Sequence, residues 1–433
     1  MKQAYLEKIE FNKILNILQN FCITFVGKKL AQNLMPSSNK NEVVNCLLET
    51  TEAITLQYRL GNSSIYEIPD ISESVKLLSL RSTLSSASLL EIAGILKLAR
   101  ELKEYYNVDF DLGELKIINS YFENLYSNPS IENAIFKSII DENTIDDKAS
   151  ANLAHIRKNI RNIESSIRSK LNSLLNSKYV REPVITIRSG RFVIPIKQEY
   201  RSEVKGFVYD ISASGSTLFI EPMAVFDLNN DLNKLHLEEN LEIQKILENL
   251  SSLFFPICEE LVKNIELIGK LDFAFAKAKY AISSSATMPE ITDNKQIILK
   301  QARHPLIDPK KVVPIDINLG INFNCLIITG PNTGGKTVSL KTTGLLCAMA
   351  LSGLYIPANE KSSVCVFDHI FADIGDEQSI QESLSTFSSH IITIIDIMKN
   401  VTEKSLVLLD ELRFWYRSCT RCMLGNKHFR SII

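Results

Sequence analysis

The stretch GPNTGGKT at residues 330–337 constrains the fold of this chain more than any other segment, because it fits the phosphate-loop pattern at every position. The apolar run NFNCLIITG that ends in the loop predicts a short buried strand, and KTVSLKTTGLLCAMALSGL predicts the helix that follows. Glycines at 330, 334 and 335 let the backbone approach a phosphate closely. The freed amides and the helix N-terminus then bind the anion, so the segment predicts a nucleotide site at a strand end.

Two motifs supply the residues of this predicted site. Lys336 is expected to reach the β- and γ-phosphates of ATP, and the Thr337 hydroxyl to ligate Mg²⁺. The apolar run SLVLLDEL ends in a carboxylate pair typical of a Walker B strand, in which Asp410 holds the Mg²⁺ shell and Glu411 positions or deprotonates the attacking water. Lys336 and Glu411 are therefore the predicted catalytic residues. The whole loop is assigned to nucleotide binding: Gly330, Pro331, Asn332, Thr333, Gly334, Gly335, Lys336 and Thr337.

Strands and helices alternate after about residue 291. SSVCVFDHIF predicts a second strand and SLVLLDEL a third, with helical patterns between them. Such alternation is typical of a parallel sheet with helices on its faces.

The preceding residues predict helices and one small β region. Residues 1–144 read as a helical core. Residues 145–290 read as two long helical regions, and Pro256 is expected to kink or divide the second. The first long helix carries a narrow coiled-coil-like stripe: Leu153, Ile156, Ile160, Ile163 and Ile167. Between the helices, at about 180–222, PVITIRSGRFVIPIKQEY predicts a hairpin at Ser189-Gly190, and KGFVYDISASGSTLFIEP predicts a second strand pair.

Charge points to a local basic surface. The chain has a formal net charge of −2, yet residues 151–210 hold twelve Lys or Arg against five Asp or Glu. This excess suits binding to a phosphate backbone, although a solvated helix face of basic composition is the alternative. No aromatic stacking platform is evident, which favours recognition of shape or backbone. The candidate nucleic-acid contacts are Arg181, Arg188, Arg191, Lys197, Arg201 and Lys205.

Taken together, these motifs resemble the MutS family of DNA-repair ATPases. TGPNTGGKT, FADIGDEQSIQESLSTFSSH and LVLLDEL occur in the order and spacing of its ATPase domain, and QARHPLI resembles the entry into that domain. The segment VITIRSGRFVIPIKQEYRSEVKGFVYDISASGSTLFIEP resembles the clamp of the second bacterial branch, which lacks mismatch-recognition and connector domains. The resemblance implies an α-helical core with long lever helices and a small β clamp. An incomplete α/β phosphate-loop ATPase domain of ABC type would follow at 291–412.

The resemblance also implies a function. Members of this branch are homodimers that use ATP and Mg²⁺ to grip branched or mismatched DNA and suppress homologous recombination, or to split collided ribosomes by contacting ribosomal RNA. Many carry a small C-terminal nuclease-type domain, which we do not expect in this chain.

The last residues depart from the family pattern. After Asp-Glu-Leu a Gly-x-Gly-Thr stretch is expected, but RFWYRSCTRCMLGNKHFRSII follows instead. Trp415 requires the codon TGG and the codon of Tyr416 begins with T, so reading one base later gives glycine. We therefore interpret 413–433 as an out-of-frame, non-native tail caused by a single-base insertion after Leu412. Impaired hydrolysis and low stability of 300–433 would follow.

Other features set limits. Eight Cys are too sparse for a disulfide scaffold, and no signal peptide or apolar run of membrane-span length occurs, so a cytoplasmic protein without a membrane partner is expected. Cys419 and Cys422 have redox or zinc spacing, but no partner Cys or His pair is nearby in the sequence, and both lie in the tail. His304 reads as structural, and His390 as either structural or close to the nucleotide.

Two alternatives remain open for the function of the chain: a hydrolysis-deficient fragment that only binds nucleotide and nucleic acid, or another ABC-type repair ATPase.

Overall fold

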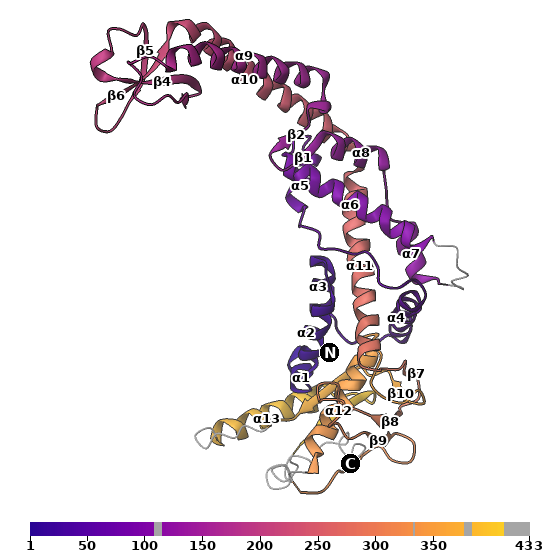
Figure 1. Cartoon of the computed structure of the whole chain (residues 1–433). Helices are drawn as coiled ribbons and strands as arrows, with labels where there is room; N and C mark the ends of the chain where they lie inside the picture. Colours follow the sequence, from indigo (N-terminus) through magenta and orange to yellow (C-terminus); the bar gives the residue numbers. More distant parts are fainter. Residues whose placement is uncertain (108–114, 332–333, 376–382, 411–433) are drawn as a thin grey trace. The chain divides into compact units, whose positions relative to one another are not determined.

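A computed structural model of the protein describes residues 1–107, 115–331, 334–375 and 383–410 (Figure 1). Helices and small sheets alternate in it, and the chain divides into two compact units that are interleaved in sequence. Unit 1 comprises 1–69, 98–126 and 263–433, and unit 2 comprises 70–97 and 127–262. The predicted non-native tail, 413–433, and Glu411 lie outside the described residues. Each unit is built from several separate stretches of the chain, so the units do not test the predicted domain limits at 144 and 290. Those limits stay predictions.

Unit 1 combines N-terminal helices with the predicted nucleotide region. Its helices are α1 (Gln3–Lys8), α2 (Phe11–Phe21), α3 (Phe25–Gln32), α4 (Lys40–Leu60), α7 (Ile117–Glu123), α12 (Lys336–Leu351), α13 (Ser383–Asn400) and the unit's parts of α6 (Ser86–Tyr106) and α11 (Cys258–Ser283). Thr24 and Asn39 cap α3 and α4 by accepting from main-chain N–H groups. The longest helices in the predicted helical core are α4 and α6, which have 21 residues each. Both have apolar faces buried in the core, which sustain helices of that length.

One apolar core joins the N-terminal helices to the phosphate-loop helix. Ile14 and Leu18 of α2 and Leu47 of α4 belong to the same buried cluster as Leu345 and Met349 of α12. The C-terminal half of α12 is apolar on all sides and completely buried, as expected for a helix enclosed by other elements. The predicted helix after the phosphate loop is thus confirmed.

The strands of unit 1 form two sheets. The first has the order β7 (Glu290–Thr292), β10 (Ser363–Cys365), β8 (Ile297–Ala302), β9 (Ile315–Leu319). The second pairs β11 (His369–Asp373) with β12 (Ser405–Leu409) in parallel. The prediction of a parallel sheet is therefore confirmed for β11 and β12 but wrong for β8, which is antiparallel to both β9 and β10. A direct connection without a crossover helix joins β8 to β9, and such connections give antiparallel pairs.

Two strand predictions need correction. SSVCVFDHIF forms two strands, β10 and β11, which belong to different sheets. The run NFNCLIITG is neither a strand nor buried: residues 321–330 are exposed. A strand is buried only when neighbouring strands take up its main-chain groups, and among the described residues none pairs with this run.

Unit 2 contains a long helix pair with a small sheet at one end (Figure 1). α9 (Ala151–Leu175) and α10 (Met223–Ser252) pack along each other, and the predicted stripe is buried at Leu153, Ile156, Ile160 and Ile167. η3 (Phe255–Ile257), which contains Pro256, separates α10 from α11 and confirms the predicted break. The remaining elements are α5 (Ser72–Ser79), α8 (Pro129–Ser138), β1 (Ile139–Asp141), β2 (Thr144–Ile145), η1 (Asp147–Ala149) and η2 (Gln198–Tyr200).

Both predicted hairpins of the small sheet are confirmed. β3 (Thr186–Arg188) pairs with β4 (Arg191–Lys197), and Ser189 and Gly190 turn the chain with φ values of 46° and 76°. β5 (Gly206–Ile211) pairs with β6 (Thr217–Pro222), and the antiparallel order is β3-β4-β6-β5. Positive φ at both turn residues fits the right-handed twist of a two-residue hairpin. We call this sheet with its connections, residues 180–222, the clamp.

Candidate nucleotide site and clamp surface

The phosphate-loop segment leads directly into α12. Gly330 and Gly335 have φ values of 152° and 76°, which favour glycine, and Gly335 precedes the first residue of the helix. Gly334 N donates to Pro331 O at 2.9 Å, and the Lys336 ammonium donates to Gly330 O across the loop. Asn332 and Thr333 lie outside the described residues. The described part thus has a turn at the start of a helix, the arrangement that binds phosphate.

The two predicted Mg²⁺ ligands are in contact although 73 positions separate them. Thr337 Oγ1 donates to Asp410 Oδ2 at 2.6 Å. Asp410 follows β12 directly, so it stands at the carboxyl end of the parallel pair, the usual place for ligands in such sheets. A hydroxyl and a carboxylate oxygen are hard donors, the type that Mg²⁺ prefers, so these residues fit the ion.

Asp373, which the sequence analysis did not single out, lies beside Asp410. Its main-chain O accepts from Asp410 N at 3.0 Å, and its carboxylate is 1% exposed. Lys8 Nζ lies 3.3 Å from this carboxylate, and His390 Nδ1 lies 2.9 Å from it. His390 therefore contacts the end of β11, next to the end of β12 that Asp410 follows. The carboxylate that ends the strand HIFAD was the available signal for Asp373.

His304 fits the structural reading. It is 5% exposed, and burial lowers the pKa of its imidazole below the ordinary value. Its Nδ1 accepts from Leu306 N at 3.3 Å, a local turn contact.

Two of the six candidate clamp residues are held in ion pairs within the clamp. Arg191 donates to Glu221 at 2.8 Å and to Asn230 at 2.6 Å, and its side chain is only 16% exposed. Arg188 Nε lies 3.4 Å from Asp210, and its guanidinium stacks 4.6 Å from the Phe219 ring centroid. Counting charges along the chain did not reveal these partners. Arg191 in particular is a poor surface contact for a ligand.

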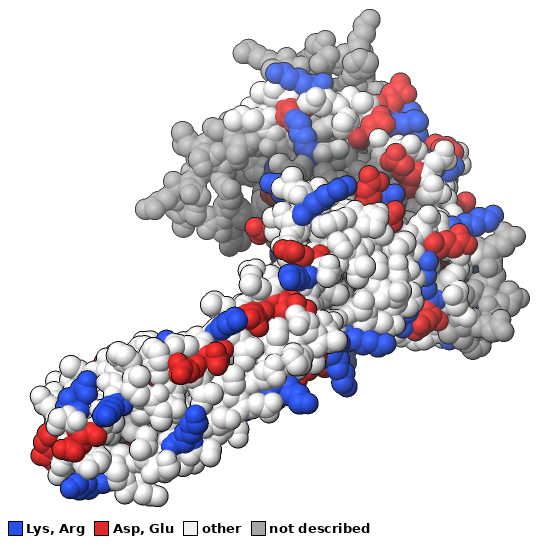
Figure 2. All heavy atoms as spheres, turned by 90° about the horizontal axis from the view of Figure 1, so that it is seen from above, with Lys and Arg blue, Asp and Glu red and all other residues white. Residues whose placement is uncertain are grey.

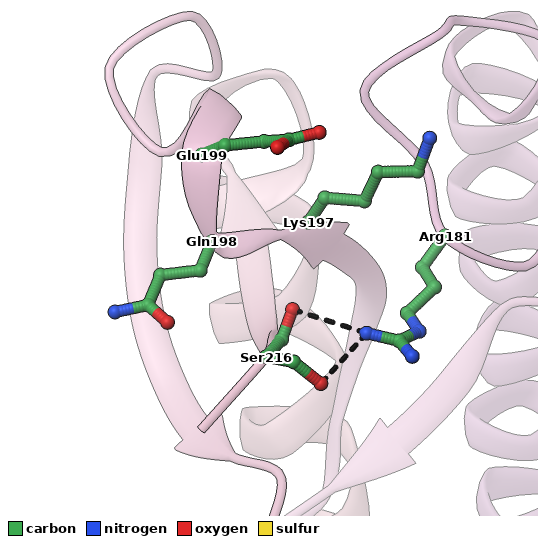
Figure 3. A pocket seen from close by; sticks show the side chains of 5 residues that line it. All are labelled: Arg181, Lys197, Gln198, Glu199 and Ser216. Atoms are coloured by element: carbon green, nitrogen blue, oxygen red, sulfur yellow. Dashed lines mark hydrogen bonds between the residues drawn. The ribbon is translucent and has the colours of Figure 1, made fainter. Parts of the chain in front are cut away.

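The other four have different surroundings. Arg181 and Lys197 line a hollow of about 470 Å³ together with Gln198, Glu199 and Ser216. Figure 3 shows Glu199 on one side of Lys197 and the contact between Arg181 and Ser216, 2.7 Å from Nη1 to Oγ, on the other. Arg201 donates to two main-chain carbonyls, those of Val204 and Gly206. Lys205 is exposed.

An aromatic pair that the sequence analysis did not recognise lies close to this hollow. The rings of Tyr179 and Tyr200 are 5.3 Å apart between centroids. Lys178 Nζ lies 5.6 Å from the first ring and Lys197 Nζ lies 6.0 Å from the second. The two tyrosines come from different segments, so no periodic pattern marked them. Cations beside aromatic faces are a common setting for nucleic-acid bases.

Charge on the visible surface is mixed. Figure 2 shows Lys and Arg interspersed with Asp and Glu over the face in view, with no extended patch of one sign. Opposite charges are also paired near α9, where Arg157 contacts Asp147 of η1 and Glu239 of α10, each at 2.7 Å. Any basic contact surface on this face is therefore local. No helix in the described ranges is long and apolar enough to cross a membrane.

Comparison with known proteins identifies the class first. Residues 326–414, which contain the phosphate loop and the Asp410 strand, match the family model for MutS domain V. The chain is a member of the MutS family.

More specifically, the chain belongs to the MutS2 type. It is 45% identical over 417 residues to "Endonuclease MutS2" of Acetivibrio thermocellus, a match that covers 95% of this chain and 53% of that protein. The protein of the same name from Clostridioides difficile is also 45% identical over 417 residues, with the same shares covered. That of Finegoldia magna is 44% identical over 415 residues, again 95% and 53%. The chain spans about half the length of the curated relatives it matches.

Proposed function

We propose that this protein is a MutS-like ATPase that binds ATP and Mg²⁺ at the 330–337 loop and couples nucleotide binding to a grip on nucleic acid. The observation that carries the proposal is the 2.6 Å contact between Thr337 and Asp410, which joins the end of the phosphate loop to the end of the Walker B strand. A chance glycine-rich turn gives no reason for that pairing.

Each residue has a distinct role in this proposal. Lys336 offsets the charge of the β- and γ-phosphates, and the loop amides with the α12 N-terminus bind the phosphate oxygens. Thr337 and Asp410 would hold the metal, which would supply positive charge beside the phosphate oxygens. Glu411, adjacent to Asp410, orients the attacking water and accepts its proton.

The clamp supplies the nucleic-acid contact in the proposal. Arg181, Lys197, Arg201 and Lys205 contact the phosphate backbone, and the Tyr179–Tyr200 pair offers a ring face beside two cations. The ligands we propose are branched or mismatched DNA, or ribosomal RNA of collided ribosomes. The proposed assembly is a homodimer of chains with a core at 1–144, levers at 145–290 and an ATPase region at 291–412. The relatives are named endonucleases, and the proposal concerns the ATP-dependent clamp alone.

A nucleotide-binding experiment tests the site. Lys336→Ala should weaken binding of a fluorescent ATP analogue by about 10–100-fold, because a charge-assisted hydrogen bond contributes roughly 1.5–3 kcal/mol. Lys341→Ala, on the same helix and paired with Glu10 at 3.7 Å, is the matched control and should bind normally. Equal affinities of the Lys336 and Lys341 variants would refute the assignment. Tight binding without phosphate release would instead favour the hydrolysis-deficient fragment.

Salt titration tests the clamp. Arg181→Ala with Lys197→Ala should weaken binding to DNA and RNA oligonucleotides and reduce the salt slope by about 0.9 per lost phosphate contact. Lys234→Ala with Lys245→Ala removes the same charge from the exposed surface of α10 and should have a smaller effect. If both pairs lowered the slope equally, general charge rather than the clamp would explain the binding.

A further inference from the structure

Asp373 is a buried carboxylate at the end of β11 that the proposed ATP chemistry does not use. With 1% of its side chain exposed, it has given up nearly all contact with water. A buried charge is tolerated only when partners replace the lost hydration. Two of its side-chain partners come from segments far apart in the sequence: Lys8 on α1, at 3.3 Å, and His390 on α13, at 2.9 Å.

The main chain at Asp373 is connected to the predicted metal ligands. Asp373 O accepts from Asp410 N at 3.0 Å, and the Asp410 carboxylate accepts from Thr337 at 2.6 Å. Two successive hydrogen bonds therefore connect Asp373 to Thr337 of α12 by way of Asp410. A shift of the backbone at Asp373 would move Asp410 with it.

A second contact holds α1 and α13 at this edge independently of Asp373. The Tyr5 ring packs edge-on against Phe371, with 5.2 Å between centroids, and its hydroxyl donates to Asp396. Lys2 Nζ lies 2.6 Å from the same Asp396 carboxylate. Loss of His390 would thus leave the helices packed while removing the closer partner of Asp373.

We propose that Asp373 is a positioning residue for the metal side of the ATP site, with His390 and Lys8 as the groups that hold its carboxylate. The inference rests on the proposed nucleotide site and assigns Asp373 no contact with nucleotide. Asp373 acts through Asp410. Its carboxylate, held by Lys8 and His390, fixes the end of β11. The hydrogen bond from Asp410 N to Asp373 O then keeps the Asp410 carboxylate beside Thr337. Partners behind a metal ligand typically affect metal affinity by about 10–100-fold.

The test measures the affinity of the full chain for a fluorescent ATP analogue in EDTA and in Mg²⁺. The ratio of the two, the Mg²⁺ gain, separates metal placement from phosphate binding. His390→Ala should reduce the gain at least about 10-fold, with affinity in EDTA within about 2-fold of wild type. His390→Asn, whose amide N–H can replace Nδ1–H, should restore part of the gain. A general loss of structure would lower both affinities together.

Lys2→Ala is the matched control, because it removes an ion pair between the N-cap of α1 and α13 without touching Asp373. It should keep the wild-type gain. A full Mg²⁺ gain in His390→Ala, or an equal loss in Lys2→Ala, would overturn the inference while the nucleotide site stands. A wild-type chain that binds in both buffers without a gain would also overturn it. Absence of wild-type binding in both buffers would refute the proposed site itself, and the inference with it.

Discussion

The clamp and the nucleotide region differ in the sequence distance between elements that pack together. In the clamp, β3 pairs with β4 and β5 with β6 through short turns, and the flanking helices α9 and α10 pack on each other. In the nucleotide region β7 pairs with β10, so that Ile291 lies opposite Val364, and Lys8 contacts Asp373. Local patterns therefore specify the first region, whereas the second depends on contacts that no local window contains.

If the two regions are also separate energetically, damage to the clamp core should not reach the nucleotide site. Phe192 is 1% exposed at the centre of the clamp core, so Phe192→Ala should lower the free energy of unfolding of unit 2 by about 3–5 kcal/mol. Hydrogen exchange followed by mass spectrometry would show the loss of protection in 151–252. Affinity for the ATP analogue should stay at the wild-type value, and a parallel loss would contradict the separation.

A glycine in each of the two units sharpens the contrast. A Cβ at Gly344 of α12 would lie 2.3 Å from Leu408 Cδ1 and 3.0 Å from Ile9 Cγ2, so Gly344→Ala should destabilise by about 1–3 kcal/mol through overpacking. Gly94 of α6 has nothing within 4 Å of its added Cβ, and Gly94→Ala should stabilise by about 0.5–1 kcal/mol. Urea unfolding measures both. If both substitutions changed the free energy of unfolding in the same direction, local helix propensity rather than contact with Leu408 and Ile9 would determine the effect at Gly344.

The smallest effect concerns pH. Because burial lowers the pKa of His304, the unfolded chain takes up a proton as pH falls below its ordinary value of about 6.5, while the folded chain does not. The free energy of unfolding should then fall by at most about 1.4 kcal/mol per pH unit until the folded pKa is reached.

His304→Gln should flatten that dependence, as followed by urea midpoints between about pH 5 and 7. Replacement of the exposed His155 on α9 is the control and should leave the slope unchanged. An unchanged slope in His304→Gln would assign the dependence to other groups.

Sequence motifs predicted some contacts between residues far apart in the chain that hydrophobic periodicity could not predict. The phosphate loop and the Asp-Glu strand end predicted a shared metal site, and Thr337 and Asp410 are bonded across 73 positions. No motif includes Lys8, 365 positions from Asp373, so that ion pair could not be foreseen. The run 321–330 has the composition of a strand, but composition does not supply the neighbouring strands. Arg191 shows the same limit for charge, since its buried partner Glu221 lies on another strand.

The Arg191 pair also bears on how this sequence can change over generations. Glu221 is fully buried, and its Oε1 accepts from Arg191 and, at 2.7 Å, from Asn229. Its Oε2 has no hydrogen-bond partner in the part of the chain that the structure describes. A lineage that lost Arg191 alone would keep a buried carboxylate without its cation, whereas joint loss of Arg191 and Glu221 would remove both charges. Arg191 and Glu221 are thus expected to vary together among descendants of a common ancestor, and single replacements to be short-lived.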